Sequence, residues 1–291
     1  MDINYELYKV FYHVAVTLSF SEASKQLFIS QSAVSQSVKV LEKKLNQTLF
    51  IRSTKRVQLT PEGEILFKHI EPAMNLIKQG ENQLLEANTL NGGQLRIGAS
   101  DTICRYYLLP YLNQFHKLYP HVHIKVTNQT SIECARLLEH GQVDFIIINY
   151  PNSALSSAHT PRVLKEFRDV FVANQEYFPL RGEKVCLAKL QTHPILMLDR
   201  KSTTSEFLHS MFQKSQLDLV PEIELSSNDL LIDLARIGLG IAFVPDFCIP
   251  EDEKELFVLK LEEDLPTRQI VVAFNENLPI SQAARQFMDI L

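Results

Sequence analysis

The 291-residue sequence predicts an α+β multidomain protein, with a small helical module, one long helix and a larger α/β body. Three observations predict this organisation. Apolar residues recur at helical spacing within the first sixty residues, a heptad pattern of apolar positions follows, and the rest of the chain alternates short strands with amphipathic helices. We expect domains at residues 1–60, 61–90 and 94–291, with a hinge at 91–93.

Charge is distributed unevenly along the chain. Residues 1–60 contain eight basic and four acidic side chains, whereas the remainder contains 21 basic and 30 acidic ones. A basic module attached to an acidic body is suited to binding a polyanion at one end only. The net charge of −5 therefore does not exclude a nucleic-acid partner.

Composition excludes several other classes of protein. With 45% hydrophobic residues and no apolar run of about 18 residues, the chain reads as a soluble globular protein without a membrane-spanning segment. Its polar start does not resemble a secretory signal, so we expect a cytoplasmic protein. The four cysteines are scattered without a C-x-x-C pair, so neither a disulfide framework nor a zinc site is predicted.

The first sixty residues predict three short helices. Leu7, Phe11, Val14 and Leu18 share one face of the first helix, Ser21 begins the second, and Ser30 is placed to cap the third. The third helix repeats the same spacing at Val34, Val38, Leu41 and Leu45. Its tight connection to the second helix predicts a helix-turn-helix over about residues 20–39.

The outward face of the third helix carries polar side chains that suit a DNA major groove. They are Gln31, Ser32, Ser35, Gln36 and Lys39. Glutamine can pair with adenine, hydroxyls can bind several bases, and lysine reaches guanine or phosphate. The alternative is the ordinary polar face of any surface helix.

Two short strands are predicted after this helix, joined by a basic tip, which together describe a wing. Its cations Arg52, Lys55 and Arg56 are expected to neutralise phosphates or to enter the minor groove. Such contacts supply salt-dependent affinity and little sequence information. Residues 1–60 therefore predict a winged helix-turn-helix.

The stretch of residues 20–63 resembles the DNA-binding module of LysR-type transcription regulators. The matching residues are Ala23, Leu27, Ser30, Gln31, Ala33, Val34, Ser35, Leu41, Glu42, Leu45, Leu49, Phe50, Arg52, Leu59, Thr60 and Gly63. Ser32 departs from the family, which commonly has proline there to set the first helical turn. The resemblance implies an activator or repressor that binds promoter DNA, is controlled by a small-molecule effector and works with RNA polymerase.

A long linker helix is predicted to begin at Pro61, with Thr60 as its cap. Its heptad positions are Leu66, Ile70, Ala73, Ile77, Gly80, Leu84 and Ala87. This pattern predicts a coiled-coil homodimer with a kink at Pro72, and the family resemblance adds homotetramers. The alternative is a long amphipathic helix packed on its own domain.

The body predicts two related α/β lobes. Strands are expected at residues 94–99, 123–127, 143–149, 194–198, 222–225 and 240–244, and helices at 106–118, 132–140, 206–214 and 230–237. The alternation predicts a largely parallel sheet covered on both faces. Crossings near residues 150–162 and 263–267 would give a first lobe of 94–162 with 267–291 and a second of 163–266. This resembles a two-lobed α/β periplasmic-binding-protein-like (type 2) effector domain.

Candidate ligand-binding residues follow the carboxyl ends of the predicted strands, where open α/β sheets bind ligands. They are Ser100, Thr102, Ile103, Thr130, Ser131, Ser202, Thr203, Ser226 and Asn228, with Arg200, Lys201 and Thr204 nearby. Hydroxyls and free amides at helix starts favour an anion such as a carboxylate, although Asp101 would repel one. The alternative is that these residues only cap helices.

The sequence contains no feature of an enzyme. The common nucleotide-binding, hydrolase and metalloprotease motifs are missing, so we expect no catalytic residues, no metal site and no cofactor. Two further readings stay open at this point: a solute-binding protein of the same fold, and a redox sensor that uses Cys104.

Overall fold

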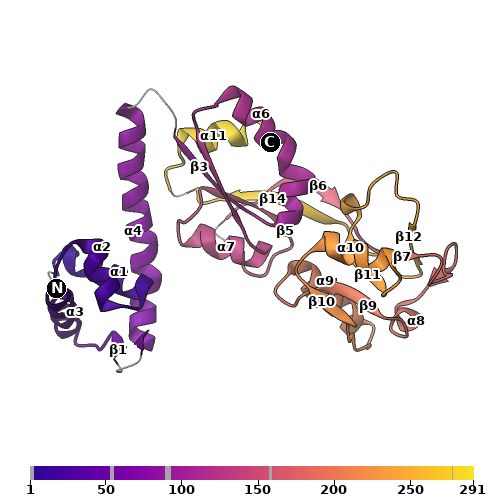
Figure 1. Ribbon diagram of the computed structural model, residues 1–291, viewed down its shortest axis with the longest axis horizontal. Helices are drawn as coiled ribbons and strands as arrows, with labels where there is room; N and C mark the ends of the chain where they lie inside the picture. The colour runs from indigo at the N-terminus through magenta and orange to yellow at the C-terminus, as the bar shows by residue number, and fades with distance from the viewer. Residues whose placement is uncertain (1–2, 53–55, 89–92, 157–158, 277) are drawn as a thin grey trace. The chain divides into compact units, whose positions relative to one another are not determined.

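The structure, a computed structural model, describes residues 3–52, 56–88, 93–156, 159–276 and 278–291 (Figure 1). The chain divides into two compact units, Met1–Asn88 with His140–Gln142, and Thr89–Glu139 with Val143–Leu291. Three residues with predicted roles lie outside the described ranges, namely Lys55 of the wing and Asn91 and Gly92 of the hinge.

The first unit is built from helices and one small hairpin. Its elements are α1 (Tyr5–Thr17), α2 (Phe20–Leu27), α3 (Gln31–Leu45), β1 (Phe50–Arg52), β2 (Val57–Leu59) and α4 (Pro61–Asn88). Phe11, Val14, Val34, Val38 and Leu41 are fully buried in its core, which fixes which faces of α1 and α3 point outward. The predicted winged helix-turn-helix is confirmed.

Two predictions about the starts and ends of these helices were wrong. The second helix begins at Phe20, because the Ser19 hydroxyl accepts a hydrogen bond from the Glu22 amide, so Ser21 lies inside the helix. Leu18 lies beyond α1 in the left-handed region at a φ of 47° and is 48% exposed, so it ends that helix. Ser30 caps α3 as predicted.

The wing and the linker helix are joined closely. Strands β1 and β2 pair antiparallel, with Phe50 opposite Leu59. Thr60 caps α4 by accepting a hydrogen bond from the Gly63 amide at 3.0 Å, and its own hydroxyl donates to the Thr48 carbonyl at 2.7 Å. Helix α4 then runs for 28 residues and continues through Pro72.

The second unit contains two lobes, each with a five-stranded sheet. The first sheet has the order β4-β3-β5-β14-β6, and the second β10-β9-β11-β7-β12. The first lobe contains β3 (Gln94–Ala99), α5 (Asp101–Ile103), η1 (Cys104–Leu108), α6 (Leu109–Leu118), β4 (His123–Asn128), α7 (Ser131–Glu139), β5 (Phe145–Tyr150), β6 (Arg162–Phe167), β14 (Arg268–Phe274) and α11 (Gln282–Met288).

The second lobe repeats the pattern of strand, helix, strand. It contains β7 (Asp169–Asn174), β8 (Lys184–Val185), α8 (Leu187–Leu190), β9 (Ile195–Leu198), α9 (Thr203–Lys214), β10 (Ile223–Leu225), α10 (Asn228–Arg236), β11 (Ile241–Pro245), η2 (Asp246–Cys248), β12 (Leu256–Val258) and β13 (Lys260–Leu261). The short strands β8 and β13 pair with each other beside the main sheet.

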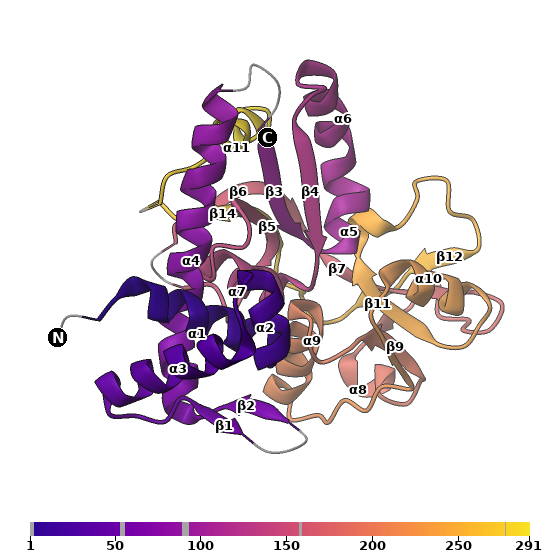
Figure 2. The same ribbon diagram turned by 60° about the vertical axis from the view of Figure 1, so that its left-hand side comes forward.

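Both faces of each sheet are covered, as predicted (Figure 1 and Figure 2). In β5, Phe145 and Ile147 pack in the core that contains α6 and α11, whereas Ile146 and Ile148 pack in the core that contains α7. This alternation follows from the two-residue period of a strand. In the second lobe, α9 and α10 likewise belong to separate cores.

The sheets and one helical segment of the second unit differ from the prediction in three respects. They are mixed, because β5, β6, β7, β11, β12 and β14 meet in antiparallel pairs. Strand β6 belongs to the first sheet, so the first crossing lies at Arg168 and not within 150–162. The helical segment after β3 begins at Asp101, well before the predicted residue 106, and passes through the π-helical turn η1.

Candidate functional site

The outward face of α3 presents the predicted polar residues. Gln31, Ser32, Gln36 and Lys39 are exposed, and Ser35 is half-buried. The buried face of the helix carries Val34 and Val38, so the core holds the polar face outward. The Ser32 and Ser30 hydroxyls lie 2.9 Å apart, so the serine at the family's proline position contacts the helix cap.

Arg52 connects the wing to α3, the recognition helix that is predicted to enter the major groove. Its guanidinium donates to the Ser35 hydroxyl at 3.0 Å and to the Glu42 carboxylate at 3.3 Å, and it lies 4.6 Å from the centre of the Phe20 ring. Glu42 in turn accepts hydrogen bonds from the Leu49 and Phe50 amides. Arg52 therefore makes three contacts within its own domain. The sequence predicted a contact with DNA for this residue and none of these internal contacts.

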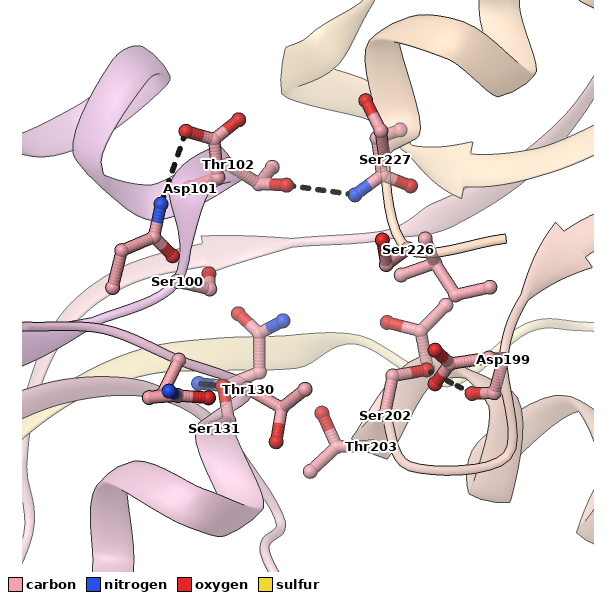
Figure 3. A pocket seen from close by; sticks show the side chains of 16 residues that line it. Ser100, Asp101, Thr102, Thr130, Ser131, Asp199, Ser202, Thr203, Ser226 and Ser227 are labelled. Carbon is pink, nitrogen blue, oxygen red and sulfur yellow. Dashed lines mark hydrogen bonds between the residues drawn. The ribbon is translucent and has the colours of Figure 1, made fainter. Parts of the chain in front are cut away.

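A cavity of about 400 Å³ lies between the two lobes, at the carboxyl ends of β3, β4, β9 and β10 (Figure 3). It is lined by Ser100, Asp101, Thr102, Asn128, Gln129, Thr130, Ser131, Asn149, Leu198, Asp199, Ser202, Thr203, Thr204, Ser226, Ser227 and Asn228. The place is the one predicted for a ligand in an α/β sheet.

Eight of the nine predicted ligand-binding residues line this cavity, and Ile103 does not. The Ile103 side chain is fully buried in the core of the first lobe, because it ends the first helical turn after β3 and faces the sheet. Arg200 and Lys201 line a neighbouring hollow together with Arg136. Thr204, beside the predicted Thr203, does line the cavity.

Several of the lining hydroxyls also cap helices. Ser100, Thr130 and Ser202 accept hydrogen bonds from the amides of Ile103, Glu133 and Ser205 at 3.4, 3.3 and 3.1 Å. In α10 the cap is Ser227 and not Ser226. Capping uses a lone pair of each hydroxyl oxygen, so Ser100 and Thr130 can still donate a proton to a ligand. The Ser202 hydroxyl already donates its proton to the Asp199 carbonyl at 3.1 Å.

Hydrogen bonds also join residues that line the cavity to one another. The Thr102 hydroxyl accepts from the Asn228 side-chain amide at 2.9 Å, which joins the first lobe to the second. The Ser131 hydroxyl accepts from the Asn149 backbone amide at 3.1 Å.

Five polar residues that line the cavity were not predicted, although each lies within two residues of the end of a strand or the start of a helix. They are Asn128, Gln129, Asn149, Asp199 and Ser227.

Two amide oxygens that belong to cavity residues are buried without a hydrogen-bond partner among the described residues. They are Oδ1 of Asn149, in the first lobe, and Oδ1 of Asn228, in the second. Buried polar atoms are normally hydrogen-bonded, so these two oxygens are exceptions among the described residues. Both residues line the cavity, but the two oxygen atoms themselves are shielded from solvent.

The thiol of Cys104 has the wrong environment for a redox sensor. Burial, together with the neighbouring Asp101 carboxylate, raises the pKa of Cys104 to about 11. Burial also raises the pKa of Cys134 to about 12, with the nearby Cys104 adding to the rise. Because the thiolate is the reactive species, both side chains are held in their unreactive form at neutral pH.

Within the described ranges, no cluster of three or more histidine, cysteine, aspartate or glutamate side chains is arranged to hold a metal ion. Nor does any helix in those ranges combine the length and the apolarity that a membrane span requires.

The winged helix-turn-helix and the two-lobed α/β unit together define a DNA-binding regulator of transcription. Two family models match: the bacterial regulatory helix-turn-helix protein of the lysR family at residues 5–64, and the LysR substrate binding domain at residues 88–291. The chain belongs to the LysR family. Its relatives are transcriptional regulators and not enzymes.

Individual relatives match over nearly the whole chain. A probable RuBisCO transcriptional regulator from Nostoc sp. is 30% identical over 284 residues, which cover 94% of this chain and 83% of the relative. The HTH-type transcriptional regulator CrgA from Neisseria meningitidis is 27% identical over 296 residues, covering 100% of this chain and 97% of the relative.

Solved structures share the fold. A full-length OxyR variant from Pseudomonas aeruginosa has a TM-score of 0.71 at 20% identity and covers 100% of this chain and 95% of its own. Full-length CbnR in complex with its target DNA has a TM-score of 0.65 at 17% identity, covering 99% of this chain and 98% of its own.

Proposed function

We propose that this LysR-type regulator reads promoter DNA through α3 and the wing, as a homodimer or homotetramer, and responds to a small anionic effector in the cavity between its lobes. The observation that carries the DNA-binding half is the polar face of α3. Gln31, Gln36 and Lys39 are exposed on it, and the buried valines of the same helix prevent it from turning inward. RNA polymerase is the further partner that regulation of transcription requires.

An anionic effector is supported by the state of the hydroxyls around the cavity. Four of these hydroxyls each accept a hydrogen bond from the protein: Thr102 at 2.9 Å, Ser131 at 3.1 Å, Thr203 at 3.0 Å and Thr204 at 3.1 Å. Each keeps one proton to donate, which suits an oxygen-rich anion. The N-termini of α7 and α9 also line the cavity, and the helix dipole favours negative charge there.

The effector needs hydrogen-bond donors as well as anionic oxygens. Asp101 and Asp199, whose carboxylates are hydrogen-bond acceptors, line the same cavity. A carboxylate that also carries a hydroxyl or amino group would meet both kinds of residue.

DNA binding is tested by fluorescence anisotropy with promoter DNA that contains two imperfectly symmetric half-sites. We expect Gln31→Ala to narrow the affinity difference between the promoter and a single-base variant by about tenfold, since a bidentate base contact contributes about 1–3 kcal/mol of discrimination. The control is Gln213→Ala, the same change on an exposed part of α9. Equal, salt-insensitive affinity of the unaltered protein for promoter and random DNA would contradict the proposal.

The effector is sought by a thermal-shift screen of hydroxy, amino and simple carboxylic acids at constant ionic strength. A ligand at about a hundred times its dissociation constant stabilises the protein by roughly 2.7 kcal/mol. We expect acids to raise the melting temperature more than their neutral amides do. A panel in which no acid has any effect would contradict an anionic effector.

A further inference from the structure

A buried ion pair contacts two residues that line the effector cavity. Arg268, the first residue of β14, is 2% exposed, and Asp169, the first residue of β7, is fully buried. The two side chains form an ion pair with 2.6 Å between Nη1 and Oδ2. Burying two charges is costly, and a paired charge is usually retained only where its additional hydrogen bonds are also made.

Two additional hydrogen bonds of the guanidinium go to residues of the cavity, whereas its Nε and Oδ1 of Asp169 have no partner among the described residues. Nη1 of Arg268 also donates to the Thr204 hydroxyl at 3.1 Å, and Nη2 donates to the Thr203 hydroxyl at 3.0 Å. Both threonines begin α9 and line the cavity, and Figure 3 shows Thr203 among the lining side chains. The guanidinium lies between the Phe167 and Phe207 rings, 5.4 and 5.2 Å from their centres, so its plane is held in place.

These contacts determine what the threonines can offer a ligand. A guanidinium has donors and no acceptor, and it stays charged at every accessible pH. A hydroxyl that accepts from it must direct its own proton elsewhere. Thr203 and Thr204 can therefore present hydrogen-bond donors to the cavity, whereas a threonine without such a neighbour can rotate and also accept.

We propose that Arg268 is a positioning residue for effector binding: it holds the Thr203 and Thr204 hydroxyls as donors, so that the start of α9 selects an oxyanion such as a carboxylate over a neutral group of the same shape. This inference rests on the effector cavity of the proposed function. It adds a residue that lies outside the cavity lining and gives the second lobe's wall a defined ligand chemistry.

The same contacts couple the ligand to the arrangement of the lobes. Arg268 starts a strand of the first lobe's sheet, whereas Asp169, Thr203 and Thr204 belong to the second lobe. A rotation of one lobe against the other would change the distances from the guanidinium to the hydroxyls. An oxyanion that requires the donors therefore favours the arrangement in which Arg268 contacts both threonines.

The test measures the binding of malonate and of its neutral diamide, malonamide, to the full chain by calorimetry at constant ionic strength. We expect the unaltered protein to prefer malonate at least tenfold, because hydrogen bonds to charged groups are about twice as strong as neutral ones. Replacing both threonines, Thr203→Val with Thr204→Val, should abolish most of that preference. The matched pair Thr203→Ser with Thr204→Ser should retain it.

Arg268 itself is tested with a charge-balanced pair, Arg268→Met with Asp169→Asn, which leaves no unpaired buried charge. Both hydroxyls remain, yet the preference for malonate should fall by about tenfold, because the hydroxyls are no longer held as donors. Arg268→Lys is the second variant. It keeps the ion pair but lacks the planar fork that reaches two hydroxyls, so it should also lose preference. Circular dichroism melting confirms that each variant is folded.

The outcomes separate this inference from the proposed function. Malonate that binds the unaltered protein no more tightly than malonamide overturns the inference, as does an unchanged preference in the Arg268 variants. The anionic effector of the proposed function is contradicted by a different result, namely that no acid of the thermal-shift panel binds. A loss of preference in the valine and Arg268 variants, with the serine pair unchanged, supports the role of Arg268.

Discussion

Arg52 holds the wing against the recognition helix within the module that is proposed to bind DNA. Its side chain is 32% exposed, and it contacts Ser35, Glu42 and Phe20. An exposed ion pair alone contributes little, but an additional hydrogen bond and an aromatic contact each contribute about 0.5–1 kcal/mol. A change at this residue is therefore expected to alter both the stability of the domain and its affinity for DNA.

We expect Arg52→Ala to lower the free energy of unfolding by about 1–2 kcal/mol and to weaken binding of promoter and random DNA alike. The control is Lys39→Ala on the exposed face of α3, which should weaken DNA binding and leave stability within about 0.5 kcal/mol. Urea denaturation and fluorescence anisotropy provide the two measurements. Unchanged stability of Arg52→Ala would show that its internal contacts do not support the domain.

At the scale of single residues, the sequence predicted which polar side chains are exposed better than it predicted which side chains contact one another. Gln31, Gln36 and Lys39 follow from helical periodicity, because the buried positions of α3 define the exposed ones. The contact between Arg52 and Glu42 depends on how the hairpin folds back on α3. The contact of Arg268 with Thr203 joins residues 65 positions apart, and nothing in either local segment indicates it.

The linker helix α4 contains two glycines with opposite surroundings. A Cβ on Gly63 would lie 2.2 Å from the Leu49 carbonyl oxygen, because the first turn of α4 packs against the chain that enters the wing. A Cβ on Gly80 would have no atom within 4 Å among the described residues, apart from its chain neighbours and the adjacent backbone of α4. In a helix interior, glycine is less favourable than alanine by about 1 kcal/mol, so only the surroundings distinguish the two positions.

Gly63→Ala should destabilise the protein by roughly 1–3 kcal/mol, whereas Gly80→Ala should stabilise it by about 0.5–1 kcal/mol. Each variant is the control for the other, since the substitution and the helix are the same. Thermal unfolding monitored by circular dichroism at 222 nm measures both. A stabilised Gly63→Ala would mean that α4 does not pack so closely against the Leu49 backbone.

At the scale of elements, prediction succeeded where a local signal exists. Ser30 and Thr60 predict the starts of α3 and α4, because a capping side chain accepts a hydrogen bond from an amide only three residues further along the chain. Strand β6 was missed, because it is an edge strand in which only Phe167 is buried and so lacks an apolar pattern. The antiparallel direction of β14 was not predicted either, because direction depends on how the chain returns from the second lobe.

At the scale of the whole molecule, the cavity was predictable in place and only partly in chemistry. The carboxyl ends of parallel strands meet at one edge of a sheet. The sequence therefore predicted that the hydroxyl-rich segments after β3, β4, β9 and β10 lie close together. Which hydroxyls donate and which accept depends on partners in other elements. Asn228 for Thr102 and Arg268 for Thr203 are examples, and both contacts cross from one lobe to the other.

The surface of α4 bears on how the whole molecule assembles. Leu66 and Ile70, the first heptad positions, pack against the core of the helix-turn-helix domain. Further along the same row, Ile77 is 57% exposed, whereas Ile65, which lies off the row, is 63% exposed. The start of the helix is therefore packed on its own domain, whereas the homodimer along its later turns stays a prediction that the exposed Ile77 side chain is consistent with.

We expect Ile77→Lys to shift the protein from dimer towards monomer, because a charge in an apolar seam between two helices loses its hydration. Ile65→Lys is the control, with the same substitution at an equally exposed position of α4, and should leave the association unchanged. Sedimentation velocity measures the oligomeric state. A monomer presents one recognition helix instead of two, so the salt dependence of promoter binding by Ile77→Lys should fall to about half. If Ile77→Lys remained dimeric and retained the full salt dependence, the seam along α4 would not be the surface through which two copies place their recognition helices on DNA.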